Sequence, residues 1–307
     1  MDYFVKVDGG LGRCICSTGA VEKYALRMSK EGHRVFVVTP YPFVFDGIDG
    51  LERVLRIDHG TLFEDYLCKG EYVDVEPYNY RGHYQEMSHL CASWNYLLNA
   101  DKSFVEPKIV LTQNELRAGQ EWVEAQRKKS GKKVLLFQPF GQAGGQKSCA
   151  SGQCGNIGVS FDETYRSLEM DTVEGLVSKL SDKFVIFLVK DYNQVDVPDT
   201  LPLTENPRLL FSILPFVDGI MGCDSMLQHA AKAVGVKCPV VVWWGGTEPV
   251  QFGYKEFHNL ENDMKRLNEP CRLPHDHSYY LRKNKGCNKF SEEFEDKAVK
   301  FLYEEGV

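Results

Sequence analysis

The stretch GCDSMLQHAAKAVG (residues 222–235) is the clearest indication of fold class in the chain. Its apolar residues recur at helical spacing after Asp224 and Ser225, either of which can cap the helix. Apolar runs at 217–221 and 239–244 flank the helix and predict strands. In such an α/β unit the positive end of the helix opens beyond the preceding strand, which suits a phosphate. An ordinary capped helix explains the same spacing.

The amino terminus repeats this order. Residues 4–7 read as a strand, 9–12 as a tight glycine loop, and 34–39 as a second strand after a helix that Gly32 ends. This is the opening of a doubly wound parallel sheet, whose ligands lie beyond the carboxyl ends of the strands. The loop lacks the later glycine and the acidic residue of the dinucleotide fingerprint, so a nicotinamide enzyme is the weaker alternative.

Two motifs resemble those of one enzyme family. The first joins Asp224-Ser225 and His229-Ala230-Ala231 to the segment GTEP (246–249), and the second places GGLG (9–12) before STGA (17–20). Together they are similar to the donor site and the glycine-rich loop of the heptosyltransferases, glycosyltransferase family 9. The resemblance implies a GT-B fold, in which two Rossmann-like α/β domains face each other across a cleft.

We place the domain boundary where the polar stretch 126–133 leads into a new apolar strand. Residues 1–130 are then an acceptor-binding domain and residues 131–290 a nucleotide-sugar-binding domain. By the resemblance, a terminal helix in residues 291–307 packs back on the first domain. The segment 142–160 is interpreted as a mobile loop over the cleft or a disordered insertion.

The resemblance implies an inverting, metal-independent transfer of a sugar from a nucleotide-diphosphate donor to an acceptor hydroxyl. The nucleotide sugar is a co-substrate, so no cofactor and no metal is expected. Backbone N–H groups at the helix start would hold the pyrophosphate, Arg166 would pair with a phosphate, and Asp191 would accept hydrogen bonds from ribose. The residues expected to hold the donor are Gly10, Gly12, Arg166, Lys190, Asp191, Asp224, Ser225, Met226, His229, Thr247 and Glu248.

The glycine-rich loop departs from the family at Arg13. The family has Leu-Gly-Asp here, and its aspartate is the expected general base. An arginine cannot accept that proton, but it can bind a phosphate. We therefore assign catalysis to Asp8, Arg13 and His229, with Asp8 as the favoured base and Asp46 or Asp49 as alternatives.

The acceptor is expected to bind the first domain, where tyrosine and histidine gather and can stack on a sugar or a base. The expected acceptor residues are Asp46, Tyr78, Tyr80, Arg81 and His83. A saccharide is the acceptor that the family implies. One alternative is a phage-type enzyme that glycosylates a hydroxymethylated DNA base, and another is a non-catalytic nucleotide-sugar or glycan-binding protein, which Arg13 motivates.

Composition limits these alternatives. A net charge of −7 over 307 residues argues against broad nucleic-acid binding, and a linker explains the basic run at 127–133 more simply than a strand-binding groove does. No apolar run approaches the roughly 20 residues of a membrane span, and the chain starts with a strand, which indicates a cytoplasmic protein. Its oligomeric state does not follow from the sequence.

Cysteine usage agrees with a reducing compartment. Ten cysteines stand in a chain rich in core residues, several of them beside expected strands, so we expect free thiols. Cys271, His275, His277 and Cys287 offer two thiols and two imidazoles near the carboxyl end. Their spacing fits no standard zinc site, and no metal is assigned to them.

Overall fold

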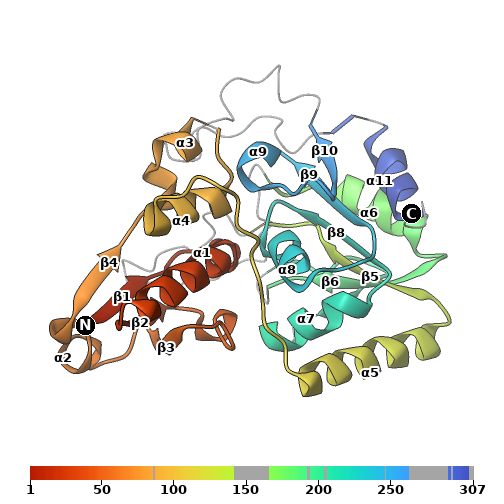
Figure 1. Cartoon of the computed structure of the whole chain (residues 1–307). Helices are drawn as coiled ribbons and strands as arrows, with labels where there is room; N and C mark the ends of the chain where they lie inside the picture. Colours follow the sequence, from red (N-terminus) through yellow and green to blue (C-terminus); the bar gives the residue numbers. More distant parts are fainter. Residues whose placement is uncertain are drawn as a thin grey trace, which may run out of the picture. The chain divides into compact units, whose positions relative to one another are not determined.

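The structure is a computed structural model that describes residues 1–85, 87–141, 166–191, 194–203, 206–245, 247–262, 290–291 and 293–303. Contacts divide the chain into two compact units. Unit 1 comprises Met1–Glu115 and His229–Gly235, and unit 2 comprises Leu116–Gln228 and Val236–Val307. Each unit contains a parallel sheet with helices, which confirms the α/β prediction (Figure 1). The loop expected at 142–160 lies outside the described residues.

The sheet of unit 1 has the strand order β3-β2-β1-β4, with every neighbouring pair parallel. The strands are β1 (Asp2–Lys6), β2 (Arg34–Thr39), β3 (Leu51–Arg56) and β4 (Glu71–Asp74). Phe4 and Phe36 stack with ring centroids 4.9 Å apart and form one core with Val38, Leu55 and Leu62. The carboxyl ends of β1 and β4 therefore lie side by side at one edge, where ligands of parallel sheets bind.

Helix α1 (Leu11–Lys30) begins inside the expected glycine loop, because Gly12 is already helical. The small residues STGA (17–20) are buried in this helix and allow another segment to approach it. A Cβ on Gly19 would lie 2.2 Å from the carbonyl oxygen of Glu106, and the backbone N–H of Lys108 donates to Thr18 Oγ1 at 2.8 Å. STGA is thus a site of close packing and not part of a loop.

Short helices complete unit 1. They are α2 (Leu62–Asp65), α3 (Arg81–Tyr84) and α4 (Leu90–Asn99), with 3-10 turns η1 (Pro42–Val44), η2 (Leu67–Lys69) and η3 (Pro77–Asn79). Helix α4 packs against α1. Trp94 on α4 is fully buried, which anchors the chain after β4 to the core of the unit.

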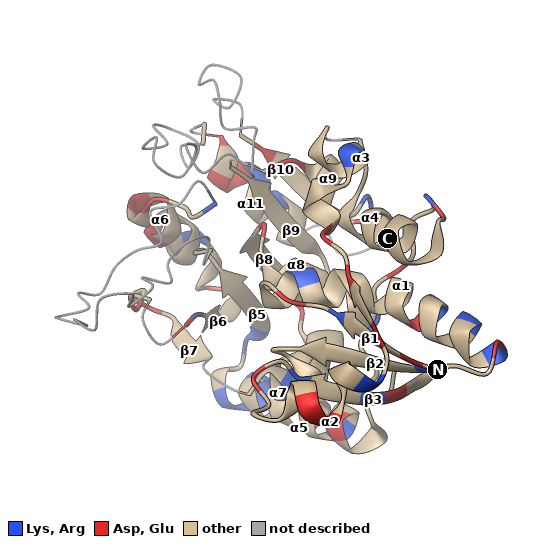
Figure 2. Ribbon diagram, turned by 90° about the vertical axis from the view of Figure 1, so that its left-hand side faces the viewer, with Lys and Arg blue, Asp and Glu red and all other residues tan. Residues whose placement is uncertain are grey.

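The sheet of unit 2 has the order β10-β9-β8-β5-β6-β7, also parallel throughout. Its strands are β5 (Lys133–Gln138), β6 (Phe184–Val189), β7 (Leu201–Leu203), β8 (Gly219–Cys223), β9 (Val240–Trp244) and β10 (His258–Glu261). Strands β8 and β9 contain no charged residue and are tan in Figure 2. Such continuous apolar strands are buried on both faces, as helices on each side require.

The helices that lie wholly or mostly in unit 2 are α5 (Gln113–Ser130), α6 (Met170–Leu180), α7 (Pro207–Ile213), α9 (Pro249–Phe252) and α11 (Phe294–Tyr303). Helix α8 (Met226–Val234) begins in unit 2 and belongs to unit 1 from His229 onward. The contact division falls after Glu115, whereas the sequence places the boundary at residue 130. The reason is that α5 packs within unit 2. A Cβ on Gly119 would lie 2.0 Å from the carbonyl oxygen of Ser212, and Arg127 pairs with Asp218 at 2.9 Å. The start of the basic run is therefore helical and not a linker.

Helix α11 differs from the expectation that it crosses back to the first domain. Phe294, Ala298 and Leu302 are buried in the core of unit 2, and Figure 1 shows α11 beside α6. Lys179 on α6 pairs with Asp296 at 2.7 Å and with Glu295 at 3.0 Å. The apolar stripe of α11 is thus used within unit 2. Within the described ranges, none of the helices combines the length and the apolar character needed to cross a bilayer.

Candidate functional site

The start of α8 is tied to the end of a neighbouring strand by Gln138. This residue ends β5, next to β8. Its Nε2 donates to Ser225 Oγ at 3.2 Å, and its Oε1 accepts from the backbone N–H of Leu227 at 3.3 Å. Gln138 therefore contacts both the loop after β8, at Ser225, and the first turn of α8, at Leu227. Gln138 belongs to none of the sequence motifs, although a polar residue that ends an apolar parallel strand is itself a signal.

Asp224 and Arg166 complete this arrangement. Asp224 is 4% exposed, and its Oδ1 accepts from Nε2 of Gln228 at 2.7 Å. Arg166 Nη1 donates to the backbone oxygen of Asp224 at 2.8 Å, and its own carbonyl oxygen accepts from Trp243 Nε1 at 3.1 Å. A guanidinium and the positive end of a helix thus meet at one place, which favours a bound anion.

Four of the expected donor residues, Arg166, Asp224, Ser225 and Met226, are therefore brought together. Others lie at the ends of strands β6 and β9 at the same edge of the sheet. Lys190 is 7% exposed, and its Nζ lies 2.6 Å from Asp196, so its charge is already paired. The N–H of Asp191 donates to Gln194 Oε1 at 3.0 Å. Thr247 is buried, Glu248 precedes α9, and Gly246 of the same motif lies outside the described residues.

Unit 1 carries an alternating row of charges at the ends of β1 and β4. Lys6 Nζ lies 3.2 Å from Asp74 and 3.1 Å from Asp8. Arg13 Nη2 lies 3.2 Å from Asp8 and 3.1 Å from Glu76. We call these five residues the charge row. The hydrogen bond to Asp8 raises the pKa of Lys6, and Asp74 adds to this effect while burial opposes it.

Arg13 is held inside unit 1. Its side chain is 10% exposed, and its guanidinium carbon lies 5.0 Å from the ring centre of Tyr78 and 5.6 Å from that of Trp94. Gly9 has a φ of +86°, and a Cβ there would lie 2.9 Å from Arg13 Cδ. The glycine loop therefore closes over Arg13. Since two carboxylates already balance its charge, the geometry does not favour the phosphate contact expected for Arg13.

The two glycines expected to hold the donor belong to unit 1. Gly10 is the N-cap of α1, and its carbonyl oxygen accepts from the N–H of Cys14 at 3.1 Å. Gly12 lies in the first turn of that helix. Both residues therefore shape the start of α1, while Asp224 and Arg166 belong to unit 2.

His229 packs in unit 1 with a cysteine. It is 4% exposed, and its Nδ1 lies 3.3 Å from Cys16 Sγ. Burial acts to raise the pKa of the Cys16 thiol, but a hydrogen bond with Cys91 and the adjacent His229 hold it well below its ordinary value. The His229 ring is thus fixed by a thiol partner, which the sequence analysis did not anticipate.

The expected acceptor residues have different environments. Tyr78 and Tyr80 are partly exposed. The ring of Tyr78 packs on His83 with centroids 5.3 Å apart, and that of Tyr80 packs on Tyr96 with centroids 4.6 Å apart. Arg81 is exposed and bonds to Gln85 at 3.2 Å, and Asp46 is exposed after η1. His83 is fully buried, and its Nδ1 lies 3.0 Å from the carbonyl oxygen of Ser88. The buried ring does not favour the expected contact with an acceptor, which stays a prediction.

Cysteine chemistry agrees with the expected free thiols. The six cysteines in the described ranges are unpaired by disulfides: Cys14, Cys16, Cys68, Cys91, Cys223 and Cys238. Burial raises the pKa of Cys14 and of Cys238 to about 12, which leaves both unreactive. The described part of the chain holds no cluster of metal-ligating side chains, and Cys271, His275, His277 and Cys287 lie outside it.

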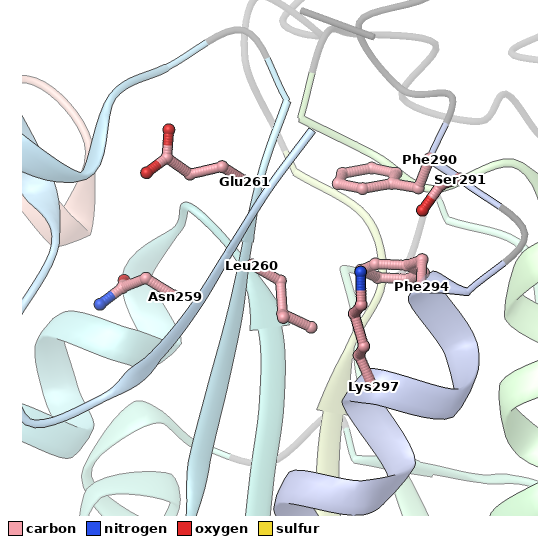
Figure 3. Close-up of a pocket in the computed structure, with 7 residues that line it drawn as sticks. All are labelled: Asn259, Leu260, Glu261, Phe290, Ser291, Phe294 and Lys297. Atoms are coloured by element: carbon pink, nitrogen blue, oxygen red, sulfur yellow. The ribbon is translucent and has the colours of Figure 1, made fainter. Parts of the chain in front are cut away.

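A pocket of about 230 Å³ lies elsewhere in unit 2, between β10 and the start of α11 (Figure 3). Leu260, Phe290 and Phe294 supply its apolar lining, and Glu261 and Lys297 are its charged residues. Asn259 is engaged by Trp244 Nε1 at 2.9 Å, so this side chain supports the fold. None of the expected donor or acceptor residues lines this pocket.

Solved structures share the fold of the chain. A family 9 glycosyltransferase from Veillonella parvula DSM 2008 is 14% identical, with a TM-score of 0.66, and the match covers 98% of this chain and 96% of that one. The ADP-heptose lipopolysaccharide heptosyltransferase II of E. coli is 11% identical, with a TM-score of 0.58, and the match covers 92% of this chain and 97% of that one. The iron-containing dodecameric glycosyltransferase TibC of enterotoxigenic E. coli H10407 is 11% identical, with a TM-score of 0.59, and the match covers 100% of this chain and 80% of that one. No protein-family model matches the sequence, and no curated protein sequence does.

These likenesses confirm the expected resemblance at the level of the fold. The chain has the α/β architecture of family 9 glycosyltransferases and heptosyltransferases, with two parallel sheets. Identities of 11–14% carry no side-chain chemistry by themselves. The activity therefore has to be argued from the residues of the two units.

Proposed function

We propose that the protein is an inverting glycosyltransferase that moves a sugar from a nucleoside-diphosphate donor to a hydroxyl of a saccharide. The observation that carries the proposal is the meeting of Arg166 with the start of α8 in unit 2. The departing diphosphate gains negative charge as the glycosidic bond breaks, and preorganised N–H donors stabilise that charge. The E. coli neighbour is described as using ADP-heptose, which makes an ADP-sugar the first donor to test.

The acceptor is assigned to unit 1. Partly exposed Tyr78 and Tyr80 offer ring faces for a sugar, and the charge row beside them offers carboxylates for the proton of the acceptor hydroxyl. No cofactor or metal is assigned to this reaction, and the cytoplasm is proposed as its compartment. A hydroxymethylated DNA base is the weaker acceptor, because Arg127 of the basic run is paired with Asp218.

Binding and turnover test the proposal. Thermal shift and calorimetry with ADP, UDP and GDP should reveal at least one ligand that stabilises the protein, since a ligand of the native state raises its apparent stability. Incubation with the matching nucleotide sugar and a saccharide should then yield a product of altered anomeric configuration. Stabilisation without transfer to saccharide or hydroxymethylated DNA would favour a binding protein. No response to any nucleotide would overturn the assignment.

A further inference from the structure

The proposed transfer needs a group that accepts the proton of the acceptor hydroxyl. Arg13 cannot accept a proton, so the candidates are the carboxylates of unit 1. The charge row contains three carboxylates, Asp74, Asp8 and Glu76, and two cations, Lys6 and Arg13. The row therefore carries one negative charge in excess. One carboxylate can take up a proton and still leave a counter-ion for each cation.

The position of each carboxylate in the row distinguishes them. Asp8 lies in the middle and contacts both Lys6 and Arg13, so a proton on Asp8 weakens two ion pairs. Asp74 and Glu76 lie at the ends and contact one cation each. When Glu76 is protonated, Arg13 keeps Asp8 as its partner and the other pairs of the row are undisturbed.

Glu76 also lies beside the aromatic residues. Its Oε2 contacts Arg13, and its Oε1 accepts from the backbone N–H of Tyr78 at 3.1 Å. This bond caps η3, and Pro77, the first residue of the turn, is buried. The carboxylate is therefore oriented by a backbone N–H and by an arginine that is nine-tenths buried, while its own side chain is 42% exposed.

We infer that Glu76 is the general base of the proposed glycosyl transfer, held in place by Arg13 and by the Tyr78 N–H. This inference rests on the proposed function. The acceptor hydroxyl gives its proton to a Glu76 oxygen, and its oxygen forms a bond to the anomeric carbon. The bond from that carbon to the diphosphate breaks, and the electron pair leaves with the nucleoside diphosphate. Arg13 is then a positioning residue, which accounts for its burial without a phosphate.

The test compares isosteric variants in the full chain. The wild-type protein is first screened with ADP-heptose and other nucleotide sugars for release of nucleoside diphosphate, with water or a saccharide as the acceptor. With a donor that is consumed, Glu76→Gln should lower the rate at saturation about 100-fold or more, the usual range for loss of a general base. Calorimetry should show unchanged affinity for the nucleoside diphosphate. The matched control is Glu52→Gln, which removes an exposed carboxylate of β3 that pairs with Arg34 outside the row and should retain the wild-type rate.

Chemical rescue separates a base from a residue that only supports the fold. Added sodium formate should restore turnover to Glu76→Ala, because a small carboxylate can occupy the vacated place, and should not accelerate the wild-type protein. If Glu76→Gln keeps its rate while Asp8→Asn loses it, Asp8 is the base and the inference is wrong. If the wild-type protein binds no nucleotide and consumes no donor, the proposed function is wrong, and the inference is overturned with it.

Discussion

The two sheets differ in how the charged side chains at the carboxyl ends of their strands are paired. In unit 1, five formal charges alternate between 3.1 and 3.2 Å apart at the ends of β1 and β4. In unit 2, the charged side chains at the corresponding edge bond to neutral groups: Asp224 accepts from the Gln228 amide, and Arg166 donates to a backbone oxygen. The first arrangement can take up a proton, and the second can hold an anion. In the transfer that we propose, unit 1 therefore supplies the base and unit 2 holds the diphosphate.

The largest expected effect is on the stability of unit 1. Arg13→Met should lower the free energy of unfolding by about 3 kcal/mol, because it removes the shared partner of two carboxylates from a largely buried place. Urea unfolding measures this. Lys6→Met is the control in the same row and should cost less than about 1 kcal/mol, since its pairs are more exposed. An equal decrease in the free energy of unfolding in both variants would contradict the larger stabilisation that we expect from Arg13.

A second expected effect concerns anion binding by unit 2. Arg166→Ala should weaken binding of the nucleoside diphosphate about 10- to 100-fold, in line with loss of a charge-assisted hydrogen bond of roughly 1.5–3 kcal/mol. Calorimetry with ADP measures the change. Lys129→Ala removes an exposed cation from α5 of the same unit and should leave the affinity unchanged. Equal weakening by both changes would reduce the site to general charge attraction.

A smaller effect should follow from a negative charge added at Gln138, beside the start of α8. Gln138→Glu keeps the shape of a side chain that accepts from the Leu227 N–H but adds a negative charge at the start of α8. We expect binding of ADP to weaken about tenfold, because the added carboxylate repels the diphosphate. The same carboxylate should stabilise the positive N-terminal end of α8. Raising the salt concentration should reduce the difference, because salt screens the added charge. A salt-independent loss would indicate a distorted loop instead.

The smallest effect concerns a pH-dependent pair away from both edges. A hydrogen bond from Lys23 at 2.5 Å, with further bonds from Ser103, holds the pKa of Asp101 below its ordinary value. The stability gained from Asp101 is therefore complete above its unfolded-state pKa of about 3.9, and it is lost as the pH falls through the lower folded-state pKa. Asp101→Asn should be slightly less stable than wild type at pH 7, with the gap closing in acid. A gap that widens in acid would contradict this sign.

Local sequence patterns predicted much of the fold. The strand at 34–39 and the start of the carboxyl-terminal sheet at β5 follow from apolar runs. The spacing after Asp224 and Ser225 predicts α8. Patterns of this kind depend on neighbours along the chain, which the sequence contains directly. They did not show why residues 17–20 are small, because the segment that packs against Gly19 lies at residues 105–106, far along the chain.

Short-range periodicity is enough to predict two parallel α/β sheets and a helix with a polar start after β8. Which side chains meet at these places depends on how the strands pair. Glu76 reaches Arg13 because β4 pairs with β1, and Gln138 reaches Ser225 because β5 pairs with β8. These partners are separated by 63 and 87 positions in the chain, as their numbers show. Strand order brings them together, and no local pattern encodes that order.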